Sequence, residues 1–247
     1  MVSKCRAAAN DFERLHSLTT DTVEKRGVQR YPIRGEITFQ NVSFAYPTRP
    51  DVSVLKDFNL HVYANESVAI VGPSGCGKST VAALIQRMYE PTSGEILLGD
   101  YKLANAEVTF LRNHIGVVSQ TASLFDASVA ENVTYGAPNI GRMEVIRACK
   151  DANINGFILG LPDGYDTHLG ENASLISGGQ AQRLQIARAL VRHASICILD
   201  ECTSALDVDN QRILLDAISR IKEVSKNIRK GLTWIPDIDN NLRHTQP

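Results

Sequence analysis

The sequence predicts an α/β fold in which a small antiparallel β subdomain precedes a mostly parallel sheet, and a helical subdomain is inserted in that sheet. Three observations support this prediction. Two stretches within residues 36–62 alternate polar and apolar side chains, as half-buried antiparallel strands do. Farther along, short apolar runs alternate with helical patterns, which is typical of a parallel sheet. Residues 121–175 lose strand character and are mainly helical in pattern.

The composition limits the class of protein. A chain of 247 residues with 43% apolar and 21% charged residues is long enough for one large globular domain. The net charge of −1 gives no basic surplus that would indicate nucleic acid as the main partner. No stretch approaches the roughly 20 apolar residues of a membrane span. The five cysteines form no C-x-x-C pair and their number is odd, so we expect reduced thiols in a cytosolic compartment and no cysteine metal site.

The first part of the chain leads from a linker into strands. Residues 1–33 are charged and weakly patterned, and we expect them to be a linker. Residues 36–44 and 54–62 alternate as antiparallel strands, with a turn-rich loop between them. The apolar run 66–71 predicts a buried strand, and residues 81–89 predict a helix that ends before Pro91.

The remaining elements follow from apolar runs and helical periodicity between Gly and Pro breaks. The continuous apolar character of residues 195–199 indicates a buried strand. Residues 209–226 have an apolar stripe at helical spacing. We expect strands at 95–99, 115–119 and 195–199, and helices at 106–113, 128–135, 142–153, 154–161, 178–193 and 209–226.

The central motif is the stretch 72–80, which matches the phosphate-binding pattern G-x-x-x-x-G-K-[ST]. Its glycines let the backbone turn its N–H groups around an anion. Lys78 adds a positive charge for the β- and γ-phosphates, and Ser79 offers a hydroxyl to Mg²⁺. The helix that follows directs its positive end at the phosphates. A chance match is the alternative, but the flanking strand and helix favour a functional loop. The predicted phosphate-binding residues are Gly72, Pro73, Ser74, Gly75, Cys76, Gly77, Lys78, Ser79 and Thr80.

Two acidic residues complete the expected metal site. Asp200 and Glu201 directly follow the apolar strand 195–199. A carboxylate at the carboxyl end of a buried strand, beside the strand of the phosphate loop, can reach Mg²⁺ through water. The adjacent Glu201 can polarise the attacking water as a general base. The alternative is a surface Asp-Glu pair after a core strand, and the presence of the phosphate loop favours the site.

The stretch Ile176-Ser-Gly-Gly-Gln180 opens a helix 20 residues before Asp200. A serine and two glycines there make an anion-binding N-terminus. The alternative is a flexible turn with Ser177 as N-cap. At this point the sequence resembles the ATP-binding cassette of ABC transporters, of the multidrug and peptide exporter type. The stretch is similar to the family's signature, which usually begins with Leu where this chain has Ile176. The resemblance covers about residues 30–221.

The resemblance implies roles for further residues. Tyr46 matches the aromatic residue that stacks on adenine, although it could be a core aromatic at a strand end. Gln120 matches the residue that senses Mg²⁺ and the transmembrane partner, although it could be an ordinary polar strand end. Residues 204–207 match the loop that contacts the opposite cassette. Residues 167–171 are similar to the segment that exporters press against their transmembrane helices, and residues 132–136 are also exporter-like.

The resemblance also implies a fold and a reaction. We expect a P-loop NTPase (RecA-like) core that binds ATP and Mg²⁺ and hydrolyses ATP for transport. The implied catalytic residues are Glu201, Lys78 and Gln120, and the implied metal residues are Ser79, Gln120 and Asp200. Besides the phosphate loop and Tyr46, the implied nucleotide-binding residues are Ser177, Gly178, Gly179 and Gln180. The expected partners are a second cassette in a head-to-tail dimer and the transmembrane domains of an exporter, at the cytoplasmic face of a membrane; we expect no nucleic acid.

The chain departs from this pattern after about residue 221. The family has a further strand and then a switch His that contacts the γ-phosphate. Residues 222–247 are a basic and then polar tail with His244, and we expect them to lack that strand. We therefore expect a linker (1–33), an ATP-binding domain (34–221) and a divergent tail (222–247), cut from a longer polypeptide. Three alternatives stay open: a cassette that binds nucleotide without turnover, a non-transport ABC ATPase that acts on nucleic acid or ribosomes, and a chain that does not fold stably.

Overall fold

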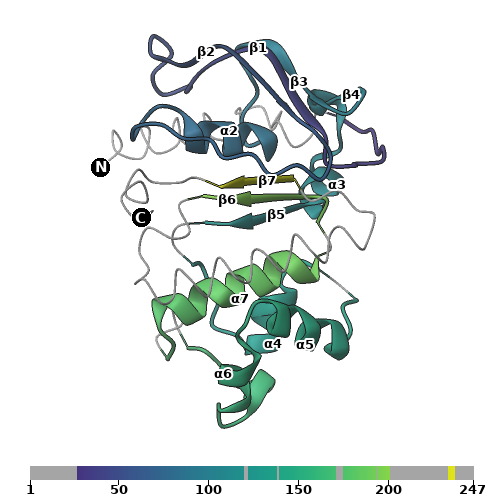
Figure 1. Cartoon of the computed structure of the whole chain (residues 1–247), viewed down its shortest axis with the longest axis vertical. Coiled ribbons are helices and arrows are strands. Elements are labelled where there is room, and N and C mark those ends of the chain that lie inside the picture. The colour runs from purple at the N-terminus through teal and green to yellow at the C-terminus, as the bar shows by residue number, and fades with distance from the viewer. Residues whose placement is uncertain are drawn as a thin grey trace, which may run out of the picture.

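The computed structural model describes residues 27–119, 122–137, 139–170, 175–192, 194–200 and 233–236. These residues form three layers (Figure 1). An antiparallel sheet and one helix lie on one side of a short parallel sheet, and a group of helices covers its other side. The predicted α/β class, with an antiparallel β subdomain and a helical insertion, is confirmed.

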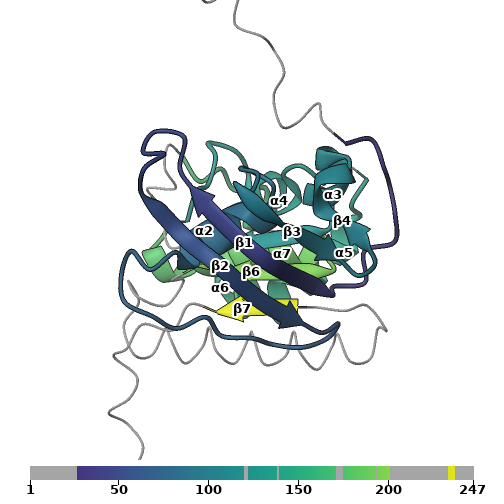
Figure 2. The ribbon, with the colours of Figure 1, turned by 90° about the horizontal axis from the view of Figure 1, so that it is seen from above.

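The antiparallel sheet contains β1 (Ile37–Ala45), β2 (Ser53–Val62), β3 (Ser93–Leu98) and β4 (Tyr101–Lys102), in the order β2-β1-β3-β4. The strands predicted at 36–44, 54–62 and 95–99 are therefore confirmed. The pairing of β1 with β2 and with β3 shifts register in the middle of β1, where Asn41 has a positive φ of 49°. An irregularity of this kind restarts the alternation, so the buried side of β1 changes from odd to even positions along the strand. Figure 2 shows this sheet lying across the parallel one.

The parallel sheet contains β5 (Ile115–Val118), β6 (Ile196–Leu199) and β7 (Thr233–Pro236), in that order. All four residues of β6 are buried, as its apolar sequence predicts. The expectation that the tail lacks a strand is wrong, because β7 pairs with β6 in parallel register from Ile196–Thr233 to Leu199–Pro236. Thr, Trp and Ile favour strand conformation, and the proline occupies only the last position.

The segment before the phosphate loop differs from its prediction. Residues 66–71 form no regular strand, and none of the six is buried. Ser67 and Ile70 form only isolated bridges, and the described ladders on the two sides of β6 are made by β5 and β7. The helix α2 (Lys78–Ile85) begins in the loop as expected but ends earlier than residue 89. It ends because Arg87 adopts a positive φ of 54°, which lets the Met88 N–H bond back to Ala83 O (2.9 Å).

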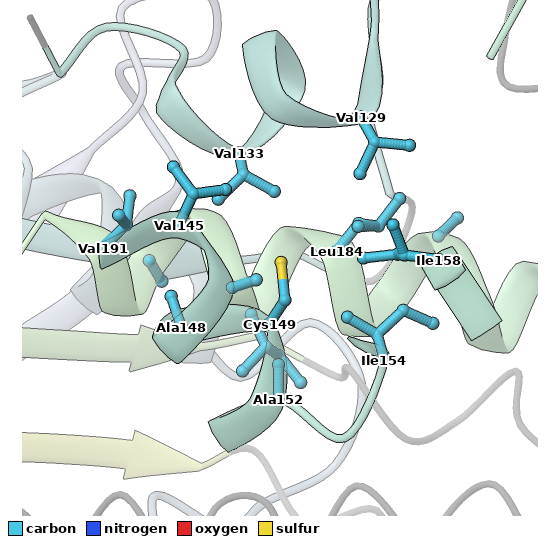
Figure 3. Close-up of a cluster of buried hydrophobic side chains, with 14 of the residues drawn as sticks. Val129, Val133, Val145, Ala148, Cys149, Ala152, Ile154, Ile158, Leu184 and Val191 are labelled. Carbon is cyan, nitrogen blue, oxygen red and sulfur yellow. The ribbon is translucent and has the colours of Figure 1, made fainter. Parts of the chain in front are cut away.

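The helices beyond the phosphate loop agree with the sequence pattern. They are α3 (Val108–Asn113), α4 (Val129–Thr134), α5 (Arg142–Asp151), α6 (Asn155–Leu159) and α7 (Gly178–Val191), with 3₁₀ turns η2 (Leu103–Asn105) and η3 (Gly164–Asp166). The predicted helix 209–226 lies outside the described residues. In Figure 3 the apolar side chains of α4, α5 and α6 meet those of α7 in one cluster. Burial in this cluster raises the pKa of the Cys149 thiol to about 12, so the thiol is neutral at physiological pH.

Ser128 caps α4 and gives a first prediction. Its hydroxyl accepts from Glu131 N (3.2 Å), while the Glu131 carboxylate accepts from Ser128 N and Oγ (both 2.8 Å). Ser128→Ala is expected to cost about 1 kcal/mol, because one helix N–H loses its partner. This corresponds to a melting temperature lower by about 2–4 °C. Thermal unfolding at pH 7 measures it, with Ser93→Ala, an exposed serine at the start of β3, as the matched control.

The same cap predicts a pH dependence. The backbone N–H and then the hydroxyl of Ser128 hold the pKa of Glu131 below its ordinary value. The stabilisation is therefore present above the ordinary pKa of glutamate and is lost as the pH falls through the lowered value. The difference between wild type and Ser128→Ala should shrink in that acid range; a difference that is constant down to pH 3 would contradict this account.

Candidate functional site

The two motifs that the sequence predicts to bind metal meet in the structure. Ser79 lies in the first turn of α2, and Asp200 follows β6. The Ser79 hydroxyl donates to Asp200 Oδ1 at 3.2 Å, across 121 residues of sequence. The Asp200 N–H donates to Val118 O (2.9 Å), which fixes Asp200 at the carboxyl edge of β5 and β6. A hydroxyl and a carboxylate are hard oxygen ligands of the type Mg²⁺ takes beside substrate phosphates, so these residues fit that ion.

The phosphate loop has the backbone that anion binding requires. Gly77 has a φ of 101°, a left-handed conformation that residues with a side chain rarely adopt, so this position favours glycine. Gly77 is the N-cap of α2 and supplies no side-chain hydrogen bond, so the first N–H groups of the helix are left for an anion. Lys78 Nζ donates to Gly72 O (3.0 Å) and Pro73 O (3.4 Å), which places the ammonium group over the loop.

Tyr46 lies just beyond β1 and contacts the P-loop helix. Its hydroxyl shares a hydrogen bond with Thr80 Oγ1 (2.9 Å). Its ring stands edge-on to those of Phe44 and Tyr89, at centroid distances of 5.0 and 5.2 Å. The structure brings this half-buried aromatic residue next to the loop and packs it against the core of the antiparallel subdomain, so its contact with adenine stays a prediction.

The N-terminus of α7 carries a capping box and is exposed at its first residues. Ser177 Oγ accepts from Gln180 N (3.3 Å), and Gln180 Oε1 accepts from Ser177 N (2.8 Å). The N-cap interpretation of Ser177 is thus confirmed as a local structure. Ser177 and Gly178 are exposed, and a Cβ on Gly178 would have no atom within 4 Å, whereas Gly179 is buried. An exposed helix N-terminus of this kind can still meet a ligand held by another molecule, so the nucleotide role of residues 177–180 stays a prediction.

Comparison with known proteins decides the family. Residues 55–204 match the family model described as ABC transporter. The chain belongs to the ABC transporter family. It is 42% identical over 220 residues to ABC transporter B family member 1 of Arabidopsis thaliana, which covers 88% of this chain and 17% of that protein. It is 44% identical over 200 residues to multidrug resistance protein pgp-1 of Caenorhabditis elegans, covering 81% and 15%.

A solved structure agrees with this family. The structure described as a bacterial Atm1-family ABC exporter with ATP bound matches with a TM-score of 0.80 and 35% sequence identity. The match covers 96% of this chain and 40% of that one. The chain thus spans less than a fifth of the two relatives named above and carries the family's ATP-binding domain, with its P-loop NTPase fold. Within the ranges that the structure describes, no helix is long and apolar enough to cross a membrane.

Two glutamines of this ABC transporter domain were not singled out as functional by sequence. Gln182 Nε2 donates to Ser119 O (3.0 Å), and Gln185 Nε2 donates to Ser119 Oγ (2.8 Å). Both side chains are buried, and they attach α7 to the end of β5, directly before Gln120. Their signal in the sequence is two polar residues, three positions apart, on a helix face that is otherwise apolar.

Several predicted residues lie outside the described part of the chain. These are Gln120, Glu201, the loop 204–207 and the last residue of the 167–171 segment. Their proposed roles rest on the sequence alone. The described part of that segment contacts the start of α4 and the residues before it, because Val129 N donates to Thr167 O (3.0 Å) and Leu169 N to Ala127 O (3.1 Å).

Proposed function

We propose that this ABC transporter domain hydrolyses Mg-ATP to ADP and phosphate and couples the reaction to export across a membrane. The observation that carries the proposal is the Ser79–Asp200 hydrogen bond beside the loop that holds Lys78. It brings the motif expected to bind phosphate and the motif expected to bind metal into one place, although they are far apart in the sequence.

Each residue has a distinct role in this proposal. Lys78 and the loop N–H groups bind the β- and γ-phosphates, and Tyr46 stacks on adenine. Ser79, Gln120 and Asp200 would hold Mg²⁺, which neutralises charge on the phosphates when bound. Glu201 accepts a proton from the water that attacks the γ-phosphorus.

The proposed partners are a second cassette and the transmembrane domains of an exporter, at the cytoplasmic face of the membrane. The N-terminus of α7 supports the first, because Ser177 and Gly178 are exposed there and the positive end of the helix dipole can face an ATP held by another chain. An exposed aromatic pair supports the second: Phe125 and Tyr135 are 42% and 52% exposed and stack at 4.0 Å. Phe125 lies two residues before Ala127, which binds the 167–171 segment, so both features can meet one apolar partner.

Nucleotide binding and phosphate release in the purified full chain test the proposal. Mg-ATP at about 100 times its Kd should add about 2.7 kcal/mol of stability, which is a rise in melting temperature of about 5–10 °C. Phosphate release should be lost in Glu201→Gln with binding retained. Binding with no release, unchanged by Glu201→Gln, would favour a cassette without turnover. Salt-sensitive binding to RNA or DNA would favour the non-transport ATPase.

A further inference from the structure

Residues 27–33, which we name the entry segment, lead into the antiparallel sheet and are docked on the loop before α3. Gln29 N donates to Asn105 O (3.0 Å), and Gln29 O accepts from Glu107 N (2.9 Å). Arg30 binds the Glu107 carboxylate at two points, one of them Nη2 to Oε1 at 3.0 Å. The end of the expected linker is therefore held by backbone and side chains together.

The next residues of the entry segment are buried. Tyr31 is 5% exposed, its hydroxyl donates to Lys102 O (2.9 Å), and its ring stacks on Tyr101 at 4.4 Å. Ile33 is also buried. A linker that only connected two domains would not need to bury these side chains, so the docking has a structural role in this domain.

Arg87 joins the entry segment to the P-loop helix. It follows the last turn of α2, and its side chain is only 1% exposed. Arg87 Nη1 donates to the carbonyl oxygen of Ala106 (2.5 Å), and Nη2 pairs with Glu90 (3.0 Å). Ala106 lies between Asn105 and Glu107, the two residues whose backbones bind Gln29. Gly27 passes over the same group with a φ of 85°; a Cβ there would lie 2.8 Å from Arg87 Nη1 and 2.5 Å from Ala106 O.

A second arginine holds the same end of α2. Arg112 of α3 donates from Nε to Gln86 O (3.2 Å) and from Nη2 to Arg87 O (3.3 Å). Cations at the carboxyl end of a helix satisfy its last carbonyl groups and favour its dipole. The other end of α2 is the phosphate loop, about 12 Å away for a helix of eight residues.

We propose that docking of the entry segment and nucleotide binding at the P-loop strengthen each other, with Arg87 as the positioning residue between them. The inference rests on the proposed binding of ATP at residues 72–80. A short helix moves as one body, so fixing its carboxyl end restricts the orientation of its first N–H groups. Less ordering then remains to be done when phosphates bind, and by linkage ATP must stabilise the docked segment by the same factor.

Gly27→Ala tests the inference without touching the site. The added methyl group collides with Ala106 O and the Arg87 guanidinium, so the entry segment should be released. We expect calorimetric titration of the full chain with Mg-ATP to show a Kd about five-fold higher. Gly99→Ala is the matched control: it also has a positive φ (56°), but nothing lies within 4 Å of its added Cβ. Its affinity should equal that of the wild type.

A charge swap gives an independent test. Arg30→Glu should release the segment and weaken ATP binding, and the double variant Arg30→Glu/Glu107→Arg should restore both. In an Arg87→Lys background, Gly27→Ala should no longer change the Kd for Mg-ATP, because the guanidinium group that links α2 to the entry segment is already absent. Conversely, Mg-ATP should slow hydrogen exchange in peptides that contain residues 27–33 of the wild type.

The outcomes separate this inference from the proposed function. Wild-type ATP affinity in Gly27→Ala, together with fast hydrogen exchange of residues 27–33, would overturn the coupling and leave the proposed function standing. A folded wild-type chain that does not bind Mg-ATP would overturn both.

Discussion

Lys78→Ala is expected to raise the Kd for Mg-ATP about 100-fold, equivalent to about 2.7 kcal/mol. The reason is the loss of charge-assisted hydrogen bonds to the phosphates, which contribute about 1.5–3 kcal/mol each. The Lys78 ammonium group already lies over the loop, 3.0 Å from Gly72 O, so phosphates can replace the loop carbonyls as its acceptors without a large movement. Calorimetric titration of the full chain measures the change.

The control removes the same charge elsewhere in the antiparallel layer. Lys102→Ala deletes an exposed ammonium group on β4 that pairs with Glu95 (2.6 Å), and its ATP affinity should stay at the wild-type value. Thermal unfolding without nucleotide should show both variants folded. Equal affinity of wild type and a folded Lys78→Ala would mean that residues 72–80 do not hold the phosphates.

Removing β7 should have the largest effect on stability. Truncation after residue 232 deletes the strand that pairs with all four residues of β6. It removes several backbone hydrogen bonds, each with a net contribution of about 1 kcal/mol, and leaves the edge of a buried strand unpaired. We expect a loss of about 3–5 kcal/mol and a melting temperature lower by about 10 °C.

A shorter truncation isolates the strand from the rest of the tail. Deleting residues 240–247 leaves β7 intact and should change the melting temperature little. If both truncations unfold at the wild-type temperature, the tail contributes no strand in solution.

Sequence could predict what is encoded locally. The alternation in β1 and β2, the helical periods of α4, α5 and α7, and the motifs of Lys78 and Asp200 each lie within a short window. The Ser79–Asp200 contact was also predictable, because a known chemistry requires the two motifs to meet.

The errors concern pairings between distant segments. Residues 66–71 are apolar, yet burial depends on which strands flank them, and β7 comes from a tail with no periodic signal. No sequence pattern marks the hydrogen bond between Arg87 and Ala106 or the position of Gly27 beside it. Single arginines and glycines are common, and nothing in the local sequence says which of them will meet.

The hydrogen bond between Ser79 and Asp200 also bears on folding kinetics. The residues that it joins are 121 positions apart in the sequence, and the pairing of β7 with β6 joins further distant residues, such as Ile196 and Thr233. Contacts of such high sequence separation form slowly, because loop closure costs entropy before the contact contributes. Helices such as α5 and α7 can form early, but ATP binding requires the complete topology. Recovery of ATP binding during refolding should therefore lag behind the recovery of helical circular dichroism.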